Sequence, residues 1–230
     1  MSVILPAPKA VIFDWDNTLV DTWPIIHEAI NSTFRTYGMK EWTFDETRAR
    51  VRKSMRDSFP EVFGENWQEA GVTYQNNYKS MHLDRLTPLP GSEELLKHIK
   101  SLGLYNVVVS NKKGDTLRKE VEKLGWAKYF DAVVGSQDAD HDKPHAAPVL
   151  LALKDSPVQA GLDVWFVGDS DIDLECAKAT GCCAVLYGEL ARGHPEFSDS
   201  HFMGHPYHHF VLDHAAARAL IGTGKRSATA

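Results

Sequence analysis

A four-residue apolar run near the start of the chain ends abruptly in two aspartates, and this feature constrains the fold most. The run, Ala10-Val11-Ile12-Phe13, contains no polar residue, which is typical of a strand buried on both faces of a parallel sheet. The next segment, Asp14-Trp15-Asp16-Asn17-Thr18, favours a turn, so the chain leaves the sheet here. Because α/β proteins place their ligands at the carboxyl ends of parallel strands, the two aspartates are candidate site residues.

The segment that follows the first strand is helical in pattern. Residues 44–52, 56–63 and 67–81 are expected to form helices, and no strand-like apolar run interrupts them. We therefore expect an all-helical insert over residues 21–87, a size typical of a small subdomain. The first helix of the insert is predicted by apolar residues at helical spacing: Ile25, Ile26, Ala29, Ile30 and Phe34.

Strands and helices alternate beyond the turn-rich linker at residues 87–91. Parallel strands need crossover helices, so the alternation predicts an α/β fold with a doubly wound, mostly parallel sheet. We expect residues 1–20 and 88–230 to form this core, with residues 21–87 as a helical cap inserted after the first strand. The apolar runs that predict the further strands are residues 106–109, 132–134, 164–167, 183–186 and 210–212, the last at an edge.

Composition and charge argue against several other classes of protein. The net charge of −6 is unfavourable for a protein that binds nucleic acid. No run approaches the roughly 20 apolar residues of a membrane helix, and no signal peptide is visible. The cysteines fit neither a disulfide framework nor a zinc site. We expect a cytoplasmic protein, monomer or homodimer, with buried free thiols at Cys176, Cys182 and Cys183.

Polar residues follow four of the expected strands, so the fold gathers them at one edge of the sheet. Clustered carboxylates need a cation, and oxygen ligands alone favour Mg²⁺. A metal beside a carboxylate and a lysine suits phosphoryl transfer, in which the carboxylate can be the nucleophile. The residues in question are Asp14 and Asp16, Ser110 and Asn111, Asp142 and Lys143, and Asp169 and Asp173.

These residues resemble the four motifs of the haloacid dehalogenase-like hydrolase superfamily. The motifs are the segment Asp14-Trp15-Asp16-Asn17-Thr18, Ser110, Lys143 and the segment Gly168-Asp169-Ser170-Asp171-Ile172-Asp173. The resemblance spans roughly residues 10–186, and the helical insert is similar to the cap of that family. It implies a Rossmann-like core and a magnesium-dependent phosphatase that acts on a small phosphorylated metabolite through a phospho-aspartyl intermediate.

The resemblance also implies a role for each catalytic residue. Asp14 attacks phosphorus, and Asp16 protonates the leaving oxygen before it activates water. Ser110 and Lys143 hold the oxygens of the transferred phosphoryl group. Asp14, Asp169 and the backbone carbonyl of Asp16 bind Mg²⁺.

Other residues are implied to support this chemistry without taking part in it. Asp173 orients Lys143 or a metal-bound water. Thr18 steadies the loop of the first motif on the substrate side, and Asn111 faces the substrate. In the cap, Arg52 or Arg56 can reach a carboxylate of the substrate, although a basic cluster of this kind is as often a solvated face.

Asp16 distinguishes the branches of the superfamily, because a dehalogenase lacks a carboxylate at this position. We therefore expect a phosphatase. The similarity is greatest to phosphoglycolate phosphatases, and it lies in three segments: Ser110-Asn111-Lys112, Lys143-Pro144-His145 and residues 54–57 of the cap. The segment Trp15-Asp16-Asn17 departs from the family pattern, in which many relatives have Asp-Gly, and we expect the chemistry to be unaffected.

Several alternatives remain open from the sequence alone. A sugar-phosphate phosphatase, a nucleotidase or a phosphomutase would use the same scaffold, and a phosphonate hydrolase would need a cap lysine at Lys40, Lys53 or Lys79. A non-catalytic phospho-acceptor receiver domain also combines acids, a hydroxyl and a lysine, but it has no helical insert after its first strand. The irregularly spaced histidines near the C-terminus do not predict a metal site: His194, His201, His205, His208, His209 and His214.

Overall fold

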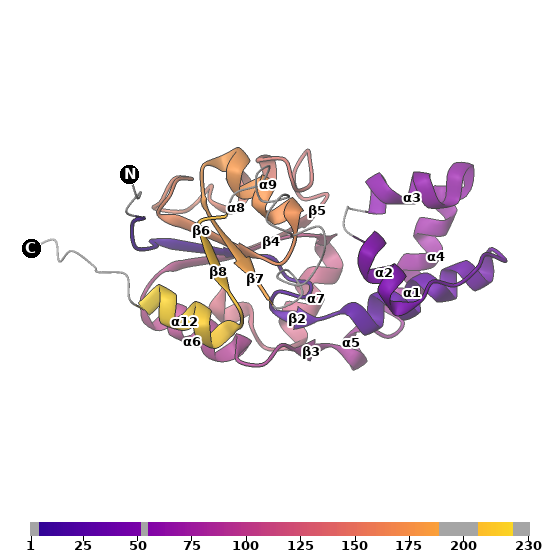
Figure 1. The fold of residues 1–230 in the computed structure, drawn as a ribbon, viewed down its shortest axis with the longest axis horizontal. Coiled ribbons are helices and arrows are strands. Elements are labelled where there is room, and N and C mark those ends of the chain that lie inside the picture. The colour runs from indigo at the N-terminus through magenta and orange to yellow at the C-terminus, as the bar shows by residue number, and fades with distance from the viewer. Residues whose placement is uncertain (1–4, 52–54, 189–206, 223–230) are drawn as a thin grey trace, which may run out of the picture.

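The computed structural model describes residues 5–51, 55–188 and 207–222 and has two lobes (Figure 1). One lobe contains a parallel sheet covered by helices, and the other is built from helices of the insert. The chain passes from the sheet lobe to the helical lobe after β1 and returns before α6. The two lobes therefore meet at the edge of the sheet where β1 ends.

The sheet has six strands among the described residues, in the order β5-β4-β1-β6-β7-β8, and all neighbouring pairs are parallel. β1 is central, and its last residue, Phe13, lies beside Val108 of β4 and Val167 of β6. The doubly wound parallel sheet expected from the sequence is confirmed. The strands are β1 (Ala10–Phe13), β4 (Tyr105–Lys113), β5 (Ala132–Ser136), β6 (Val164–Gly168), β7 (Cys183–Tyr187) and β8 (His209–Val211).

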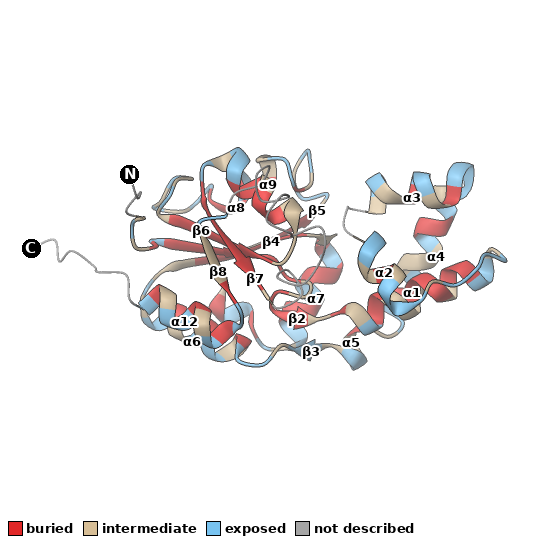
Figure 2. Cartoon of the chain, in the orientation of Figure 1, coloured by how far each residue is buried: buried red, intermediate tan, exposed pale blue. Residues whose placement is uncertain are grey.

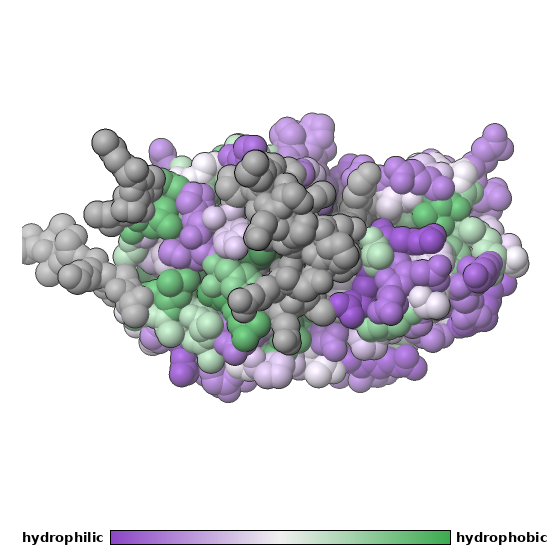
Figure 3. Space-filling model, viewed as in Figure 1, coloured by the Kyte–Doolittle hydropathy of each residue, from purple (hydrophilic) through white to green (hydrophobic). Residues whose placement is uncertain are grey.

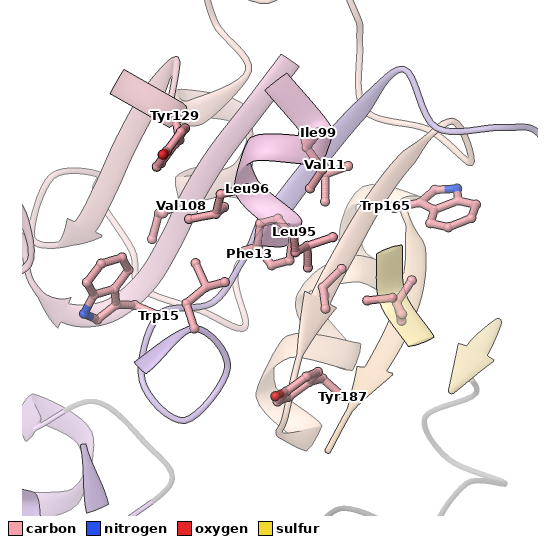
Figure 4. Close-up of a cluster of buried hydrophobic side chains, with 14 of the residues drawn as sticks. Val11, Phe13, Trp15, Leu95, Leu96, Ile99, Val108, Tyr129, Trp165 and Tyr187 are labelled. Atoms are coloured by element: carbon pink, nitrogen blue, oxygen red, sulfur yellow. The ribbon is translucent and has the colours of Figure 1, made fainter. Parts of the chain in front are cut away.

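Helices cover both faces of the sheet, and alternate residues of each strand point to opposite helix layers. Val11 and Phe13 pack with α6 (Ser92–Ser101), α7 (Gly114–Lys123) and α12 (His214–Gly222), in the cluster shown in Figure 4. Ala10 and Ile12 pack with α8 (Ala147–Ala152) and α9 (Asp171–Thr180). Figure 2 shows the resulting buried sheet between two layers of helices that are exposed on their outer sides. The short 3₁₀ helix η2 (Ala127–Tyr129) precedes β5.

The insert is helical, as predicted. Its interior is an aromatic cluster in which Phe34, Phe59 and Phe63 pack around Ile30 and Ala70. α1 and α3 both pack on α4. The elements of this lobe are α1 (Trp23–Thr36), α2 (Phe44–Arg50), α3 (Met55–Phe63), η1 (Gly64–Asn66), α4 (Trp67–Lys79) and α5 (His82–Arg85).

A small ribbon at the base of the insert was not expected from the sequence. β2 (Val20–Asp21) pairs antiparallel with β3 (Thr87–Pro88), so two strands lie where the chain enters and leaves the helical lobe. A strand of two residues has no periodicity to detect, and Pro88 is tolerated because both strands of a two-stranded ribbon are edge strands. The ribbon ties the two connections together.

The surface and the thiols agree with an ordinary globular chain. Hydrophilic residues are spread over both lobes of the face in Figure 3, with smaller hydrophobic areas between them. All three cysteines are free and buried, as expected. In the described part of the chain, the helices are too short or too polar to cross a bilayer.

Candidate active site

Asp14 and Lys143 form the centre of the candidate site. Asp14 directly follows β1, and Lys143 Nζ lies 2.7 Å from Asp14 Oδ1 and 2.7 Å from Asp173 Oδ1. All three side chains are buried. Burial of the ammonium opposes its charged form, but the two carboxylates hold the pKa of Lys143 above its ordinary value. The three segments expected to meet at the sheet edge thus do meet.

Three carboxylates of the site lie close enough to share one cation. Asp14, Asp169 and Asp173 each offer an oxygen, and these oxygens lie within 4.8 Å of one another. Burial, partly opposed by Lys143, raises the pKa of Asp14 to about 6, and the charges of Asp173 and Asp16 add to the shift. Burial raises the pKa of Asp169 as well, and the charges of Asp173 and Asp14 add to this shift. A buried set of oxygen donors that repel one another fits a hard divalent cation such as Mg²⁺.

Asp173 differs from the other two carboxylates because protein donors already engage both of its oxygens. Oδ1 accepts from Lys143 Nζ, and Oδ2 accepts from the backbone N–H of Ser170 at 3.1 Å and from its hydroxyl at 2.7 Å. These bonds also cap the first turn of α9. The arrangement suits a residue that fixes Lys143 better than one that binds a metal.

Ser110 and Asn111 come from the end of β4 and line the same cavity as Asp14. The side chain of Asn111 holds the backbone of Lys143 on both sides: its Nδ2 donates to the Lys143 carbonyl at 3.0 Å, and its Oδ1 accepts from the Lys143 N–H at 2.9 Å. The sequence predicts that Asn111 faces the substrate. In the structure Asn111 lines the cavity, and its amide also holds the backbone of Lys143.

Asp16 contacts a lysine that sequence reasoning missed. Lys112 Nζ lies 2.6 Å from Asp16 Oδ1 and 2.6 Å from Glu120 Oε2, and it donates to the Tyr78 hydroxyl at 2.7 Å. Lys112 is largely buried, and the two carboxylates raise its pKa although burial opposes this. Lys112 thus links the first motif to α7 and to α4 of the helical lobe.

Glu120 is fully buried and is the centre of this network. Besides Lys112, it accepts from Trp15 Nε1 at 2.6 Å and from the Tyr78 hydroxyl at 3.1 Å, and His82 Nδ1 lies 2.8 Å away. Burial alone would raise the pKa of Glu120, but Lys112 and these hydrogen bonds lower it to about 2. The sequence contained a signal for it, since Glu120 occupies the apolar face of α7 between Leu117 and Val121.

The other described residues that were expected in the site, Thr18 and Arg56, do not line the cavity that holds Asp14. Thr18 is buried, and its hydroxyl lies 3.4 Å from Asp169 Oδ1 without lining the cavity. Arg56 pairs with Asp142 of the sheet lobe through two contacts of 2.7 Å, and it does not line the cavity that holds Asp14. Arg52 lies outside the described residues.

Neither described candidate for a cap lysine reaches the site. Lys40 is exposed, Lys79 pairs with Asp115 at 3.3 Å, and neither lines the cavity; Lys53 lies outside the described residues. The described residues also do not include His194, His201 and His205. His214 is buried, with Nε2 at 2.8 Å from the carbonyl oxygen of Thr18, so this histidine supports the loop of the first motif.

The cavity has a volume of ≈ 220 Å³ and lies between the sheet edge and the helical lobe. Residues of the sheet lobe form its polar end, and residues of α1, α2, α3 and α4 contribute to its other walls. Of the residues expected in the site, the ones that line it are Asp14, Asp16, Ser110, Asn111, Lys143 and Asp169.

Comparisons with known proteins show the family and the fold. A model of the haloacid dehalogenase-like hydrolase family matches residues 11–186. A phosphoglycolate phosphatase of Pseudomonas aeruginosa is 29% identical over 194 residues, which cover 79% of this chain and 70% of that protein. A phosphoglycolate phosphatase of Neisseria gonorrhoeae is 30% identical over 195 residues, which cover 80% and 82%. A haloacid dehalogenase-like protein of Streptococcus pneumoniae, 21% identical, has the same fold, with a TM-score of 0.80 over 93% of this chain and 98% of that one.

Proposed function

Because the chain belongs to the haloacid dehalogenase-like hydrolase family, we propose that it is a magnesium-dependent phosphatase that hydrolyses a small phosphorylated metabolite. The observation that carries the proposal is the buried Lys143 ammonium, held between Asp14 and Asp173 at the rim of a cavity. A cation beside an acceptor carboxylate provides a binding site for a phosphate dianion. Both phosphoglycolate phosphatases compared above support a phosphomonoester as the substrate.

Asp14 is the nucleophile in this proposal. Its carboxylate oxygen attacks phosphorus, the bond between phosphorus and the leaving oxygen breaks, and an aspartyl phosphate forms. Lys143 and Ser110 bind the oxygens of the transferred group. Asp173 and Asn111 hold Lys143 by its ammonium and its backbone, so the charge is in place before substrate arrives.

Asp16 is the general acid and base. It donates a proton to the leaving alcohol in the first step, and it removes a proton from the water that hydrolyses the aspartyl phosphate in the second. Lys112 fixes the position of this carboxylate at 2.6 Å. Thr18 and His214 support the loop that carries both aspartates.

The carboxylates of Asp14 and Asp169, with the backbone carbonyl of Asp16, would hold Mg²⁺. The ion would neutralise charge on the phosphate and on the nucleophile when bound. We further propose residues 21–87 as the cap and residues 1–20 and 88–230 as the core, with the Arg56–Asp142 pair as a contact between them. That the protein is cytoplasmic, and a monomer or a homodimer, stays a prediction.

The test is a screen of phosphorylated metabolites with and without Mg²⁺, on wild type and on Asp14→Asn. We expect turnover only with wild type and Mg²⁺, and a phosphoenzyme sensitive to hydroxylamine in Asp16→Ala. Asp140→Asn, in an exposed loop, is the matched control and should retain full activity. Activity of Asp14→Asn near the wild-type level would refute the proposal.

A further inference from the structure

The walls that the helical lobe contributes to the cavity are mostly apolar. They include Ile26, Ile30, Trp42, Phe59, Val62 and Tyr74, and the cavity is continuous with the carboxylates and Lys143 at its other end. A phosphate held at Lys143 therefore directs its leaving group toward these side chains.

Two polar atoms on this side of the cavity have no hydrogen-bond partner in the described part of the chain. Trp23 Nε1, at the start of α1, is a buried donor, and Gln75 Oε1, on α4, is a buried acceptor. The Gln75 Nε2 atom donates to the sulfur of Met55, with Nε2 to Sδ at 3.8 Å. Buried polar atoms are normally paired, so Trp23 Nε1 offers a donor and Gln75 Oε1 an acceptor to a polar group of a bound ligand.

Among the described residues of the helical lobe, Arg48 and Arg50 are the cations that line the cavity. Arg56 is occupied by Asp142 outside the cavity. Arg50 lines the cavity but is exposed, lies 3.7 Å from Glu46 and stacks over the Trp42 ring at 5.0 Å. Arg48 also lines the wall, and it is the described cap cation that we test as a partner for a substrate carboxylate.

We propose that this cavity selects phosphomonoesters whose leaving group is a bulky apolar alcohol, with a polar group that pairs with Trp23 and Gln75. The proposal rests on the phosphatase function proposed above and specifies the substrate class of the same site. A two-carbon leaving group leaves the aromatic wall uncovered, whereas a ring fills it. Each buried methylene contributes roughly a fourfold preference.

The experiment compares kcat/KM for ethyl phosphate, 2-phenylethyl phosphate and phosphoglycolate. The first two release alcohols of similar acidity, so their ratio reports binding of the ring and not the chemistry. We expect 2-phenylethyl phosphate to exceed each of the other two by at least about 30-fold. A hydroxyl on the ring, as in 2-(4-hydroxyphenyl)ethyl phosphate, should add about threefold to tenfold through Trp23 and Gln75.

Variants of the wall residues test which side chains cause each substrate preference. Phe59→Leu should lower the ratio of phenylethyl to ethyl phosphate, and Trp23→Phe and Gln75→Leu should each remove the hydroxyl preference. These ratios do not depend on the fraction of protein that is folded. Val72→Ala, on the exposed side of α4, is the control and should leave the ratios unchanged.

The outcomes separate this inference from the proposed function. If no phosphomonoester is hydrolysed, the function itself is wrong. If esters are hydrolysed but phosphoglycolate or ethyl phosphate has the same kcat/KM as 2-phenylethyl phosphate, the function stands and the apolar substrate class is overturned. Loss of phosphoglycolate turnover in Arg48→Gln would likewise overturn it, because the cavity would then select a carboxylate. If the ring is preferred but its hydroxyl makes no difference, the pairing with Trp23 and Gln75 is overturned.

Discussion

Lys112 Nζ lies 2.6 Å from Asp16 Oδ1, so the proposed general acid is held by a cation from a different strand. The same ammonium contacts Glu120, which also binds Trp15 and Tyr78. Asp16 is therefore positioned by a network that includes a residue of the helical lobe. The helical lobe and Asp16 are therefore linked through Lys112, which contacts both Tyr78 and Asp16.

The first prediction concerns Lys112. Lys112→Met should lower kcat by about 10- to 100-fold, because the carboxylate of Asp16 loses the contact that fixes it, while Asp14 and Lys143 are untouched. Rapid-quench measurements should show that both formation and hydrolysis of the phosphoenzyme slow down. Lys119→Met, at an exposed position of α7, should behave as wild type. An unchanged kcat in Lys112→Met would mean that Asp16 needs no such support.

The second prediction concerns the stability that Glu120 provides. Glu120→Gln should lower the free energy of unfolding by about 3–5 kcal/mol, because Lys112 stays buried with one carboxylate fewer. Urea denaturation of the metal-free protein measures this loss. Glu122→Gln, exposed on the same helix, should change it by less than about 0.5 kcal/mol. Equal stability of the two variants would contradict the role of Glu120.

The third prediction is a pH dependence that follows from the pKa of Asp14. Burial raises this pKa from 3.8 to about 6, so the metal-free fold favours neutral Asp14. Its contribution to stability is present below about pH 4 and is lost as the pH rises to about 6. Mg²⁺ needs the ionised form, so its affinity should increase as the pH rises through about 6. Calorimetric titration with Mg²⁺ between pH 5 and pH 8 tests this, and an affinity that stays constant over that range would contradict it.

The elements could be predicted because they depend on local sequence, and the meeting of the candidate site residues could be predicted because a parallel sheet brings its strand ends together. The strands are short apolar runs, and the site lies where they end, so Asp14, Lys143 and Asp169 follow from a parallel sheet. The contacts of Asp16 with Lys112, and of Lys112 with Glu120, could not be predicted from the sequence. Glu120 lies more than one hundred positions from Trp15, and only the packing of α7 on the first motif brings them together.

The cap arginines show the same limit. The sequence contains a basic cluster, and residue type alone suggests that it binds a substrate carboxylate. The partner of Arg56 is Asp142, 86 positions away in a loop of the other lobe, and a pairing of that range has no local signal. The apolar wall of the cavity was hidden for a similar reason, because its side chains have the spacing of an ordinary helical core.

The fourth prediction concerns the Arg56–Asp142 pair. Burial opposes ionisation of Asp142, but hydrogen bonds from Arg56 and Ser136 hold its pKa below the ordinary value. Arg56→Gln should raise KM several-fold with little change in kcat, because the pair joins the two lobes without touching the reacting atoms. A double-mutant cycle with Asp142→Asn should show a coupling energy of about 0.5–3 kcal/mol. Additive effects of the two substitutions would show that the pair does not hold the lobes together.

The last prediction concerns Gly168, the final residue of β6. A Cβ at this position would lie 2.4 Å from Asp173 Oδ2 and 2.3 Å from its Cγ, closer than nonbonded atoms approach. Gly168→Ala must displace the carboxylate that holds Lys143, so we expect kcat to fall at least about tenfold. Overpacking should also cost about 1–3 kcal/mol in the free energy of unfolding. Gly161→Ala is the matched control, since the nearest atom to its added Cβ lies at 3.5 Å and ordinary contact results. Steady-state kinetics and thermal unfolding of both variants test the point: wild-type kcat in Gly168→Ala would mean that Lys143 keeps its place without Asp173.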